Sequence, residues 1–341
     1  MSGDGAERLV GREISNCQLL RVLGEGSTGV VYLAKQKLLD REVACKILLP
    51  ELASSPEYLS RFLQEARLVA RLDHPNIVQA LDAGSTSDGF SYFIMEYVPG
   101  KSLEDIRVSA PERLTPDFLL DTFIALADAL DYAWRSHGIT HGDIKPGNLL
   151  IRDGDNMLKL ADLGLAKIAG AASGEDVMAT PLYVAPEVIW GTDSGPAADI
   201  YSFGVMCYEL LAGKPPFDGD IDEVIEQHKF SIPQPLFVAN PDIDRELSDF
   251  VASMLEKEPS NRPADWGVVR EFLAGYRARS RSGSGRRDAR TLRRLQKEAE
   301  RHLPESPGSV RGGKWLQIAA AALALAALIA LVVLFISFSS I

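Results

Sequence analysis

The sequence predicts an α+β protein with two lobes, a small one rich in strands and a larger one that is mainly helical, followed by one apolar C-terminal helix. Three observations lead to this prediction. Short β-branched and aromatic runs separated by turns fill residues 16–98, helical periodicity dominates residues 99–276, and no charged residue occurs from Trp315 to Ile341. With 341 residues and 46% hydrophobic content, the chain is long enough to bury a full core and to carry more than one lobe.

The small lobe, residues 16–98, is predicted to contain strands and one helix. Residues 1–15 are polar and glycine-rich, and we expect them to be flexible. The helix is expected at residues 60–72, where Phe62, Ala66 and Val69 share one apolar face. The strands are expected at residues 17–23, 30–34, 42–48, 77–83 and 92–97.

The large lobe, residues 99–276, begins at a hinge marked by Pro99-Gly100. Thr115 is a good N-cap and is followed by Pro and Asp, which favour the first helical turn, so a long helix is predicted from there to Gly138. Two short strands and four further helices are expected at residues 149–151, 158–160, 197–212, 221–229, 244–256 and 263–276.

A basic segment and an apolar segment follow the two lobes. Residues 277–314 hold 12 Lys or Arg and 4 Asp or Glu, and residues 288–303 have the pattern of a short basic amphipathic helix. Residues 315–338 exceed the ~20 apolar residues that cross a bilayer and lack the polar face of a buried core helix. We therefore expect a single-pass transmembrane helix, preceded by a cytoplasmic linker that faces anionic headgroups rather than by a nucleic-acid-binding arm.

This arrangement predicts a protein of the inner cell membrane whose N-terminal lobes lie in the cytoplasm. The three cysteines, Cys17, Cys45 and Cys207, are odd in number and scattered, which indicates reduced thiols rather than a metal site. The alanine-rich stretch 319–327 would let two membrane helices pack closely in a homodimer, although such a stretch is more often simply apolar.

The clearest chemical signal is the stretch His-Gly-Asp-Ile-Lys-Pro-Gly-Asn at residues 141–148. Asp143 supplies a carboxylate to orient a hydroxyl, Lys145 a cation beside a moving phosphoryl group, and Asn148 an amide oxygen for a metal ion. The stretch resembles the catalytic loop H-R-D-x-K-x-x-N of the eukaryotic-like (Hanks-type) protein kinases, with Gly142 in place of the Arg. It also resembles the H-G-D-x-x-x-x-N loop of aminoglycoside and choline kinases, so this stretch alone leaves both families open.

Motifs farther along the chain favour the protein kinases. Residues 185–187 resemble the A-P-E motif, and Arg262 is expected to be the buried partner of its Glu. Asp199, which starts a D-x-x-S-x-G motif, is expected to brace the backbone of the catalytic loop. Small-molecule phosphotransferases lack these features. The resemblance covers residues 17–275 and implies the two-lobed protein-kinase fold for residues 16–276, of the kind found in bacterial Ser/Thr kinases.

The resemblance also implies an ATP site. The segment Gly24–Val31 has the pattern G-x-G-x-x-G-x-V and leads from strand to strand, as in the kinase glycine-rich loop, whereas a dinucleotide-binding turn leads from a strand into a helix. A purely structural hairpin is the remaining alternative. Met95 would close the back of the adenine pocket, and the backbone of residues 96–98 would supply hinge hydrogen bonds. The expected nucleotide-binding residues are Leu23, Gly24, Glu25, Gly26, Ser27, Thr28, Gly29, Val31, Ala44, Lys46, Met95, Glu96, Val98 and Leu150.

Lys46 and Glu65 are expected to form the ion pair that positions the phosphates. Residues 43–46 resemble the third-strand motif V-A-I-K, and Glu65 lies on the helix that follows. Each residue alone has an ordinary explanation, a solvated lysine and a helix-surface salt bridge. Their joint spacing within the other motifs favours the functional pair.

Asp162 and Asn148 are expected to hold Mg²⁺, with Mn²⁺ as an alternative ion. Asp162-Leu163-Gly164 resembles the D-F-G motif with Leu in place of Phe. His141, Leu163 and Val69 would then stack between the lobes. This interpretation gives His141 a packing role and a backbone hydrogen bond rather than proton transfer.

The combined motifs imply an ATP-dependent Ser/Thr kinase whose substrates are proteins. Lys145 and Thr180 fit the Ser/Thr branch, and Thr180 would hydrogen-bond Asp143 and Lys145. Because Gly142 has no side chain to bind a phosphate, activity is expected not to depend, through that contact, on phosphorylation of the activation loop, for example at Ser173. The alternatives are an ATP-binding pseudokinase scaffold and a small-molecule phosphotransferase. No nucleic-acid partner is expected.

Overall fold

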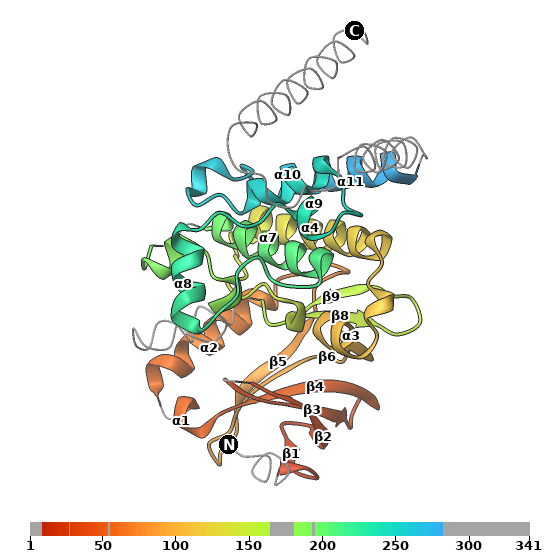
Figure 1. Cartoon of the computed structure of the whole chain (residues 1–341). Helices are drawn as coiled ribbons and strands as arrows, with labels where there is room; N and C mark the ends of the chain where they lie inside the picture. Colours follow the sequence, from red (N-terminus) through yellow and green to blue (C-terminus); the bar gives the residue numbers. More distant parts are fainter. Residues whose placement is uncertain (1–8, 27, 54, 164–180, 193–194, 282–341) are drawn as a thin grey trace, which may run out of the picture. The chain divides into compact units, whose positions relative to one another are not determined.

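The computed structural model describes residues 9–26, 28–53, 55–163, 181–192 and 195–281 (Figure 1). The chain divides into two compact units, Met1–Gly285 and Arg286–Ile341, and all the described residues belong to the first unit. Among these residues, no helix combines the length and the apolar character needed to cross a membrane. The helices expected at residues 288–303 and 315–338 lie outside the described residues.

In the described part of the chain, six antiparallel strands form the sheet of the small lobe, drawn in red and orange in Figure 1. Their order is β1-β2-β3-β4-β6-β5, so that neighbours along the chain are mostly neighbours in the sheet. All five predicted strands are present. The strands are β1 Glu13–Ile14, β2 Cys17–Glu25, β3 Gly29–Gln36, β4 Arg41–Leu48, β5 Ala80–Ser85 and β6 Ser91–Glu96.

The described part of the N-terminus differs from the flexible segment that was expected for residues 1–15. Glu13 and Ile14 form β1 and pair with β2. Ile14 is fully buried in an apolar cluster with Leu19 and Tyr32. A strand of two residues has no periodic pattern of its own, and it forms here because the neighbouring strand satisfies its backbone and the cluster buries its side chain.

The other side of the sheet joins the main core through Phe93 and Met95, which cluster with Phe62 of helix α2. The helix α2 spans Pro56–Val69 and follows the short helix α1, Pro50–Ala53. It therefore begins and ends earlier than the predicted range 60–72. The strand predicted from residue 77 begins at Ala80, because Ile77 and Val78 pair instead with Leu160, whose carbonyl accepts the Val78 amide at 2.9 Å.

The large lobe begins with two elements that the sequence pattern did not reveal, β7 (Gly100–Ser102) and α3 (Leu103–Ser109). Ser102 caps α3 in a reciprocal capping box with Asp105. The predicted long helix is confirmed as α4, Pro116–His137, with Thr115 as N-cap and left-handed Gly138 as C-cap. β7 forms a three-stranded sheet with the predicted strands β8 (Leu149–Arg152) and β9 (Leu158–Leu160), in which β8 is central and pairs with both neighbours. The catalytic loop lies between α4 and β8.

The centre of the large lobe is α7 (Pro196–Ala212), whose side chains are mostly buried. It packs against α4 and α10, and α4 packs along α11. The helix α11 continues beyond the predicted end at Tyr276, because buried Arg277 forms a bidentate pair with Asp121 of α4. The remaining helices are α6 Pro186–Ile189, α7 Pro196–Ala212, α8 Ile221–Phe230, α9 Leu236–Ala239, α10 Arg245–Met254 and α11 Trp266–Arg281.

Candidate active site

The catalytic loop is braced by Asp199 from the first turn of α7. Its two carboxylate oxygens accept hydrogen bonds from the backbone amides of His141 and Gly142, at 2.6 and 2.8 Å. The brace expected from the sequence is therefore confirmed. Gly142 has a φ of +79°, a left-handed conformation that is favourable only without a Cβ atom.

Asp143, Lys145 and Asn148 lie together, as the sequence predicted. Lys145 Nζ is 2.6 Å from Asp143 Oδ2. Asn148 Nδ2 donates to the Asp143 carbonyl at 2.7 Å and to Asp143 Oδ2 at 3.0 Å. Because the amide NH₂ of Asn148 faces Asp143, its amide oxygen faces the opposite way. That oxygen is thereby oriented to ligate a cation, a role that suits a neutral hard oxygen.

His141 is fully buried and has the structural role that was expected. Its Nε2 donates to the Ala161 carbonyl at 3.1 Å, and its Nδ1 accepts from the Asp143 amide at 3.1 Å. A carbonyl oxygen can only accept, so Nε2 carries the hydrogen and Nδ1 is bare. The imidazole thus ties the backbone of Asp143 to the residue that precedes Asp162, and both of its nitrogens are used in doing so.

Lys46 of β4 meets Asp162 across the site. Lys46 Nζ is 3.0 Å from Asp162 Oδ1, and the lysine is 6% exposed. Burial of Asp162 opposes its ionisation, but the Lys46 charge and hydrogen bond, with smaller help from the charge of Lys145, outweigh burial and lower the pKa of this carboxyl. Asp162 is therefore an anion, as a metal ligand must be. The side chain of Glu65 is not among the described ones, so its pairing with Lys46 stays a prediction.

Asp162 also has an unusual backbone. Its φ is +53°, which a residue with a side chain adopts only when its surroundings hold it there. The backbone amide and carbonyl of the neighbouring Ala161 both hydrogen-bond to the catalytic loop. The amide donates to the Asn148 carbonyl at 2.9 Å, and the carbonyl accepts from His141 Nε2. Asp162 and the catalytic loop are consequently fixed relative to one another.

The glycine-rich segment is a strand–turn–strand hairpin, as expected for this loop. The Gly26 amide donates to the Gly29 carbonyl at 2.9 Å, which closes the turn between β2 and β3. A Cβ atom on Gly29 would lie 2.3 Å from the Ile47 carbonyl oxygen, so this position requires glycine for the packing of β4. A Cβ atom on Gly24 would meet nothing within 4 Å, so its backbone is open on that side. Ser27 lies outside the described residues.

The expected adenine-contacting side chains come from both lobes and belong to one apolar assembly. Ala44 and Met95 are buried in the main core, and Val31 and Leu150 are partly buried against it. Val31, Ala44 and Met95 lie on strands of the small lobe, whereas Leu150 lies on β8. Ala44 and Met95 are paired directly across β4 and β6, and the contact of Leu150 with the other three residues stays a prediction.

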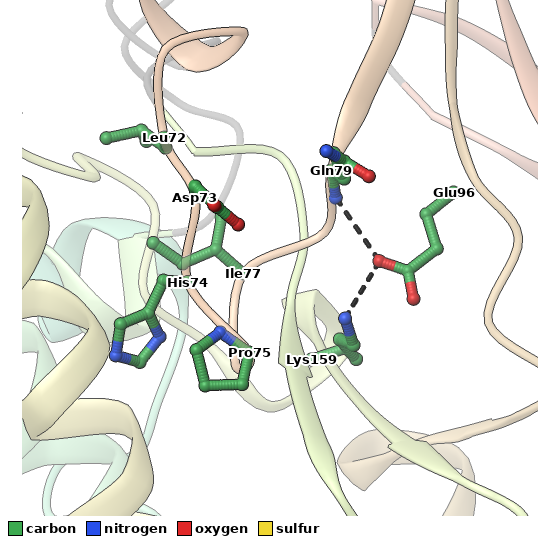
Figure 2. A pocket seen from close by; sticks show the side chains of 8 residues that line it. All are labelled: Leu72, Asp73, His74, Pro75, Ile77, Gln79, Glu96 and Lys159. Atoms are coloured by element: carbon green, nitrogen blue, oxygen red, sulfur yellow. Dashed lines mark hydrogen bonds and ion pairs between the residues drawn. The ribbon is translucent and has the colours of Figure 1, made fainter.

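Glu96, at the end of β6, ties the predicted hinge to the large lobe. Its carboxylate accepts a hydrogen bond from Lys159 Nζ of β9 at 2.8 Å and another from the backbone amide of Gln79 at 3.3 Å (Figure 2). Gln79, Glu96 and Lys159 line a pocket whose other lining residues lie in the segment 72–77. Lys159 was not predicted as a site residue. A signal was present, because it is a lysine between two buried leucines of a short strand, and such a lysine needs an anionic partner.

Glu187 and Arg262 form the buried pair that the sequence predicted. Arg262 Nη1 and Nη2 donate to the two Glu187 oxygens at 2.5 and 2.7 Å. The guanidinium also donates to the backbone carbonyls of Ala197, Glu256 and Lys257. This geometry fixes the A-P-E segment, residues 185–187, to the start of α7 and to residues 256–262.

The donor set fits a nucleotide with Mg²⁺. The Asp162 carboxylate and the Asn148 amide oxygen are hard ligands. Asn148 contacts Asp143 directly, and its carbonyl accepts from the amide of Ala161, the residue before Asp162. Within the described ranges, no group of three or more His, Cys, Asp or Glu is arranged to hold a metal by itself. A site with so few protein ligands matches an ion that takes its other oxygens from phosphates and water. Gly164, Ser173 and Thr180 lie outside the described residues, and their predicted roles stay predictions.

A strand-rich lobe and a helical lobe that share a glycine-rich hairpin, a buried Lys–Asp pair and an Asp–Lys–Asn loop define a phosphotransferase of the protein-kinase class. Comparison with family models agrees, since the protein kinase domain matches residues 17–273. The chain therefore belongs to the protein kinase family.

Bacterial Ser/Thr kinases are among its relatives. The chain is 36% identical over 262 residues to a probable serine/threonine-protein kinase of Clostridium perfringens, covering 74% of this chain and 37% of that one. It is 36% identical over 269 residues to PknA of Mycobacterium tuberculosis, covering 76% and 61%. The chain thus spans about a third to three-fifths of the length of these relatives. The crystal structure of the PknI kinase domain of M. tuberculosis matches with a TM-score of 0.63 at 30% identity, covering 78% of this chain and 96% of that one.

Proposed function

We propose that this chain is an ATP-dependent kinase that phosphorylates Ser and Thr hydroxyls of proteins. The observation that carries the proposal has two parts. Asp143 is within hydrogen-bond distance of Lys145 and Asn148, and Lys46 is within hydrogen-bond distance of Asp162. Ala161, which precedes Asp162, joins the two groups through its backbone hydrogen bonds to Asn148 and His141. Family membership and the Ser/Thr kinases among its relatives support the reaction type.

Each of these residues has a distinct task in phosphoryl transfer. Asp143 hydrogen-bonds the substrate hydroxyl and accepts its proton. Lys145, already beside Asp143, neutralises charge that develops on the phosphoryl group, and Lys46 binds the phosphates that remain on the nucleotide. Asn148 and Asp162 would hold Mg²⁺, which supplies charge neutralisation at the phosphate oxygens.

Phosphate transfer from labelled ATP to a basic acceptor protein tests this function, with Asp143→Asn beside the wild type. Loss of a general base lowers turnover by about 10²- to 10⁴-fold, so we expect transfer to fall by at least the lower figure while ATP binding is retained. Asp153→Asn, which removes an exposed carboxylate in the turn after β8, serves as the matched control and should leave transfer unchanged. A wild type that binds ATP but transfers no phosphate would instead support a scaffold without catalysis.

We further propose that residues 315–338 anchor this kinase in the inner membrane, with the catalytic lobes in the cytoplasm. The support comes from the sequence, namely an uncharged apolar segment after a basic one. Full-length protein should remain with lipid vesicles after an alkaline wash, whereas residues 1–285 should remain in the supernatant. Equal partitioning of the two proteins would contradict the anchor.

A further inference from the structure

His228 of α8 is a buried histidine outside the catalytic constellation. It is fully buried, and its Nε2 lies 3.1 Å from the carbonyl oxygen of Leu182. Its Nδ1 lies 2.9 Å from the hydroxyl of Tyr201 on α7. Leu182 is two residues after Thr180, which is predicted from the sequence to hydrogen-bond Asp143 and Lys145, so this contact reaches the segment that follows Thr180 in the chain.

The chemistry of the partners fixes the direction of every hydrogen bond. The Leu182 carbonyl can only accept, so Nε2 of His228 carries the hydrogen and Nδ1 accepts from the Tyr201 hydroxyl. The oxygen of Tyr201 in turn accepts from Lys257 Nζ at 3.3 Å. The result is a relay of donors that runs in one direction, from Lys257 through Tyr201 and His228 to the backbone of Leu182.

The surroundings hold the imidazole neutral and in this orientation. The rings of Phe217 and Tyr201 contact it edge to face, with centroids at 4.9 and 5.7 Å. Burial first, and then the nearby Lys257 charge, lower the pKa of His228 to about 4. Lys257 also donates to the Gln227 carbonyl at 3.3 Å, which attaches it to the backbone of α8 next to His228.

Lys257, the first residue of the relay, is hydrogen-bonded to Arg262, the partner of Glu187. Arg262, which binds Glu187, also donates to the Lys257 carbonyl at 3.0 Å. The segment from Leu182 to Glu187 is therefore attached at both ends to the region around residues 257–262. The attachment at Leu182 is made to main chain, so it fixes the backbone path and does not depend on the side chain at that position.

We propose that His228 is a positioning residue for the protein acceptor. Through the Lys257–Tyr201–His228 relay it holds the backbone at Leu182, so that the segment 181–187, which follows Thr180, keeps the one conformation in which the acceptor binds. This inference rests on the proposed kinase function. It assigns no contact between His228 and ATP, and it therefore separates acceptor binding from nucleotide binding.

The test is steady-state kinetics of the full-length protein with a histone mixture as acceptor. His228→Phe keeps an aromatic ring but removes both hydrogen bonds. Of the two, the hydrogen bond to the Leu182 carbonyl holds the segment, and its loss corresponds to about tenfold, so KM for the acceptor should rise by about that factor while KM for ATP stays within about twofold. His228→Gln, whose amide retains a donor, should recover most of the loss. His137→Phe, an exposed histidine at the end of α4, is the matched control and should change neither constant.

Hydrogen exchange gives a readout that needs no catalysis. Peptides that cover residues 181–187 should exchange faster in His228→Phe and in Tyr201→Phe than in the wild type or in His137→Phe. Unchanged acceptor KM and unchanged exchange in His228→Phe would overturn the proposal, as would equal rises in KM for ATP and for acceptor. If the wild type transfers no phosphate, the kinase function fails, and the exchange data alone then decide whether the relay holds this segment.

Discussion

Gly142 takes the place of an arginine according to the resemblance to the kinase catalytic loop, and its backbone conformation is one that suits glycine. Its backbone is left-handed, and its amide is committed to Asp199. A residue with a Cβ atom would be strained in this conformation unless the hydrogen bonds to Asp199 offset the strain. The departure from the motif therefore removes a side chain and relieves backbone strain, and it leaves Asp143, Lys145 and Asn148 in contact.

Gly142→Ala should lower the free energy of unfolding by about 1–2 kcal/mol, because a Cβ atom disfavours left-handed backbone. Gly147→Ala is the matched control in the same loop, since Gly147 has no positive φ and a Cβ atom there would meet nothing within 4 Å. Urea denaturation of both variants measures the difference. A loss no larger in Gly142→Ala than in Gly147→Ala would contradict the strain argument.

At the scale of elements, α7 organises the large lobe. Its first turn braces the catalytic loop through Asp199, its Tyr201 enters the relay to Leu182, and its Glu209 accepts from the hydroxyl of Tyr183. Burial raises the pKa of Glu209, and only hydrogen bonding and the charge of Arg107 counteract this. One buried helix thus positions both the catalytic loop and the segment at residues 182–183.

The Glu187–Arg262 pair joins the A-P-E segment to residues 256–262, and breaking it should be costly. Arg262→Met leaves a buried carboxylate without its partner, which destabilises a fold by about 3–5 kcal/mol. The double variant Arg262→Met/Glu187→Leu should cost less than the sum of its single changes, because no uncompensated charge remains. Arg279→Met, which breaks the exposed pair with Glu246, is the control and should cost no more than about 1 kcal/mol. Urea midpoints that rank Arg262→Met with Arg279→Met would refute this.

At the scale of the described unit, backbone and charge contacts connect the two lobes. Val78 and Asn76 pair with Leu160, Glu96 pairs with Lys159, and Lys46 pairs with Asp162. These contacts lie at the hinge and at the catalytic centre. The stability of the whole unit also depends on pH, because burial shifts the pKa of titratable groups outside the active site, such as His228.

His228 should make the unit sensitive to acid. Its pKa is about 4 in the fold and 6.5 when unfolded, so between these values the unfolded chain binds a proton that the fold does not. The free energy of unfolding therefore falls as pH drops from 6.5 toward 4, by about 2–3 kcal/mol at pH 4.5. Urea denaturation of wild type and His228→Gln at pH 7 and pH 4.5 isolates this contribution, because the carboxylates are common to both. Equal losses in the two proteins would exclude His228 as the source.

The sequence by itself determined the elements with strong local patterns and the residues that act within one short loop. The long helix α4 follows from its cap and periodicity, and Asp143, Lys145 and Asn148 are close because six residues of chain hold them close. The glycine-rich hairpin and the Glu187–Arg262 pair were also predicted, since they belong to motifs in a recognisable order.

Only the tertiary structure decided the short strands and the contacts outside known motifs. β1 and β7 exist because neighbouring strands pair with them, and no two- or three-residue pattern announces such a strand. The Lys46–Asp162 pair joins residues 116 positions apart, and His228 meets Leu182 across 46. Such contacts depend on the path of the whole chain, which many weak packing interactions set jointly, so local sequence carries little information about them.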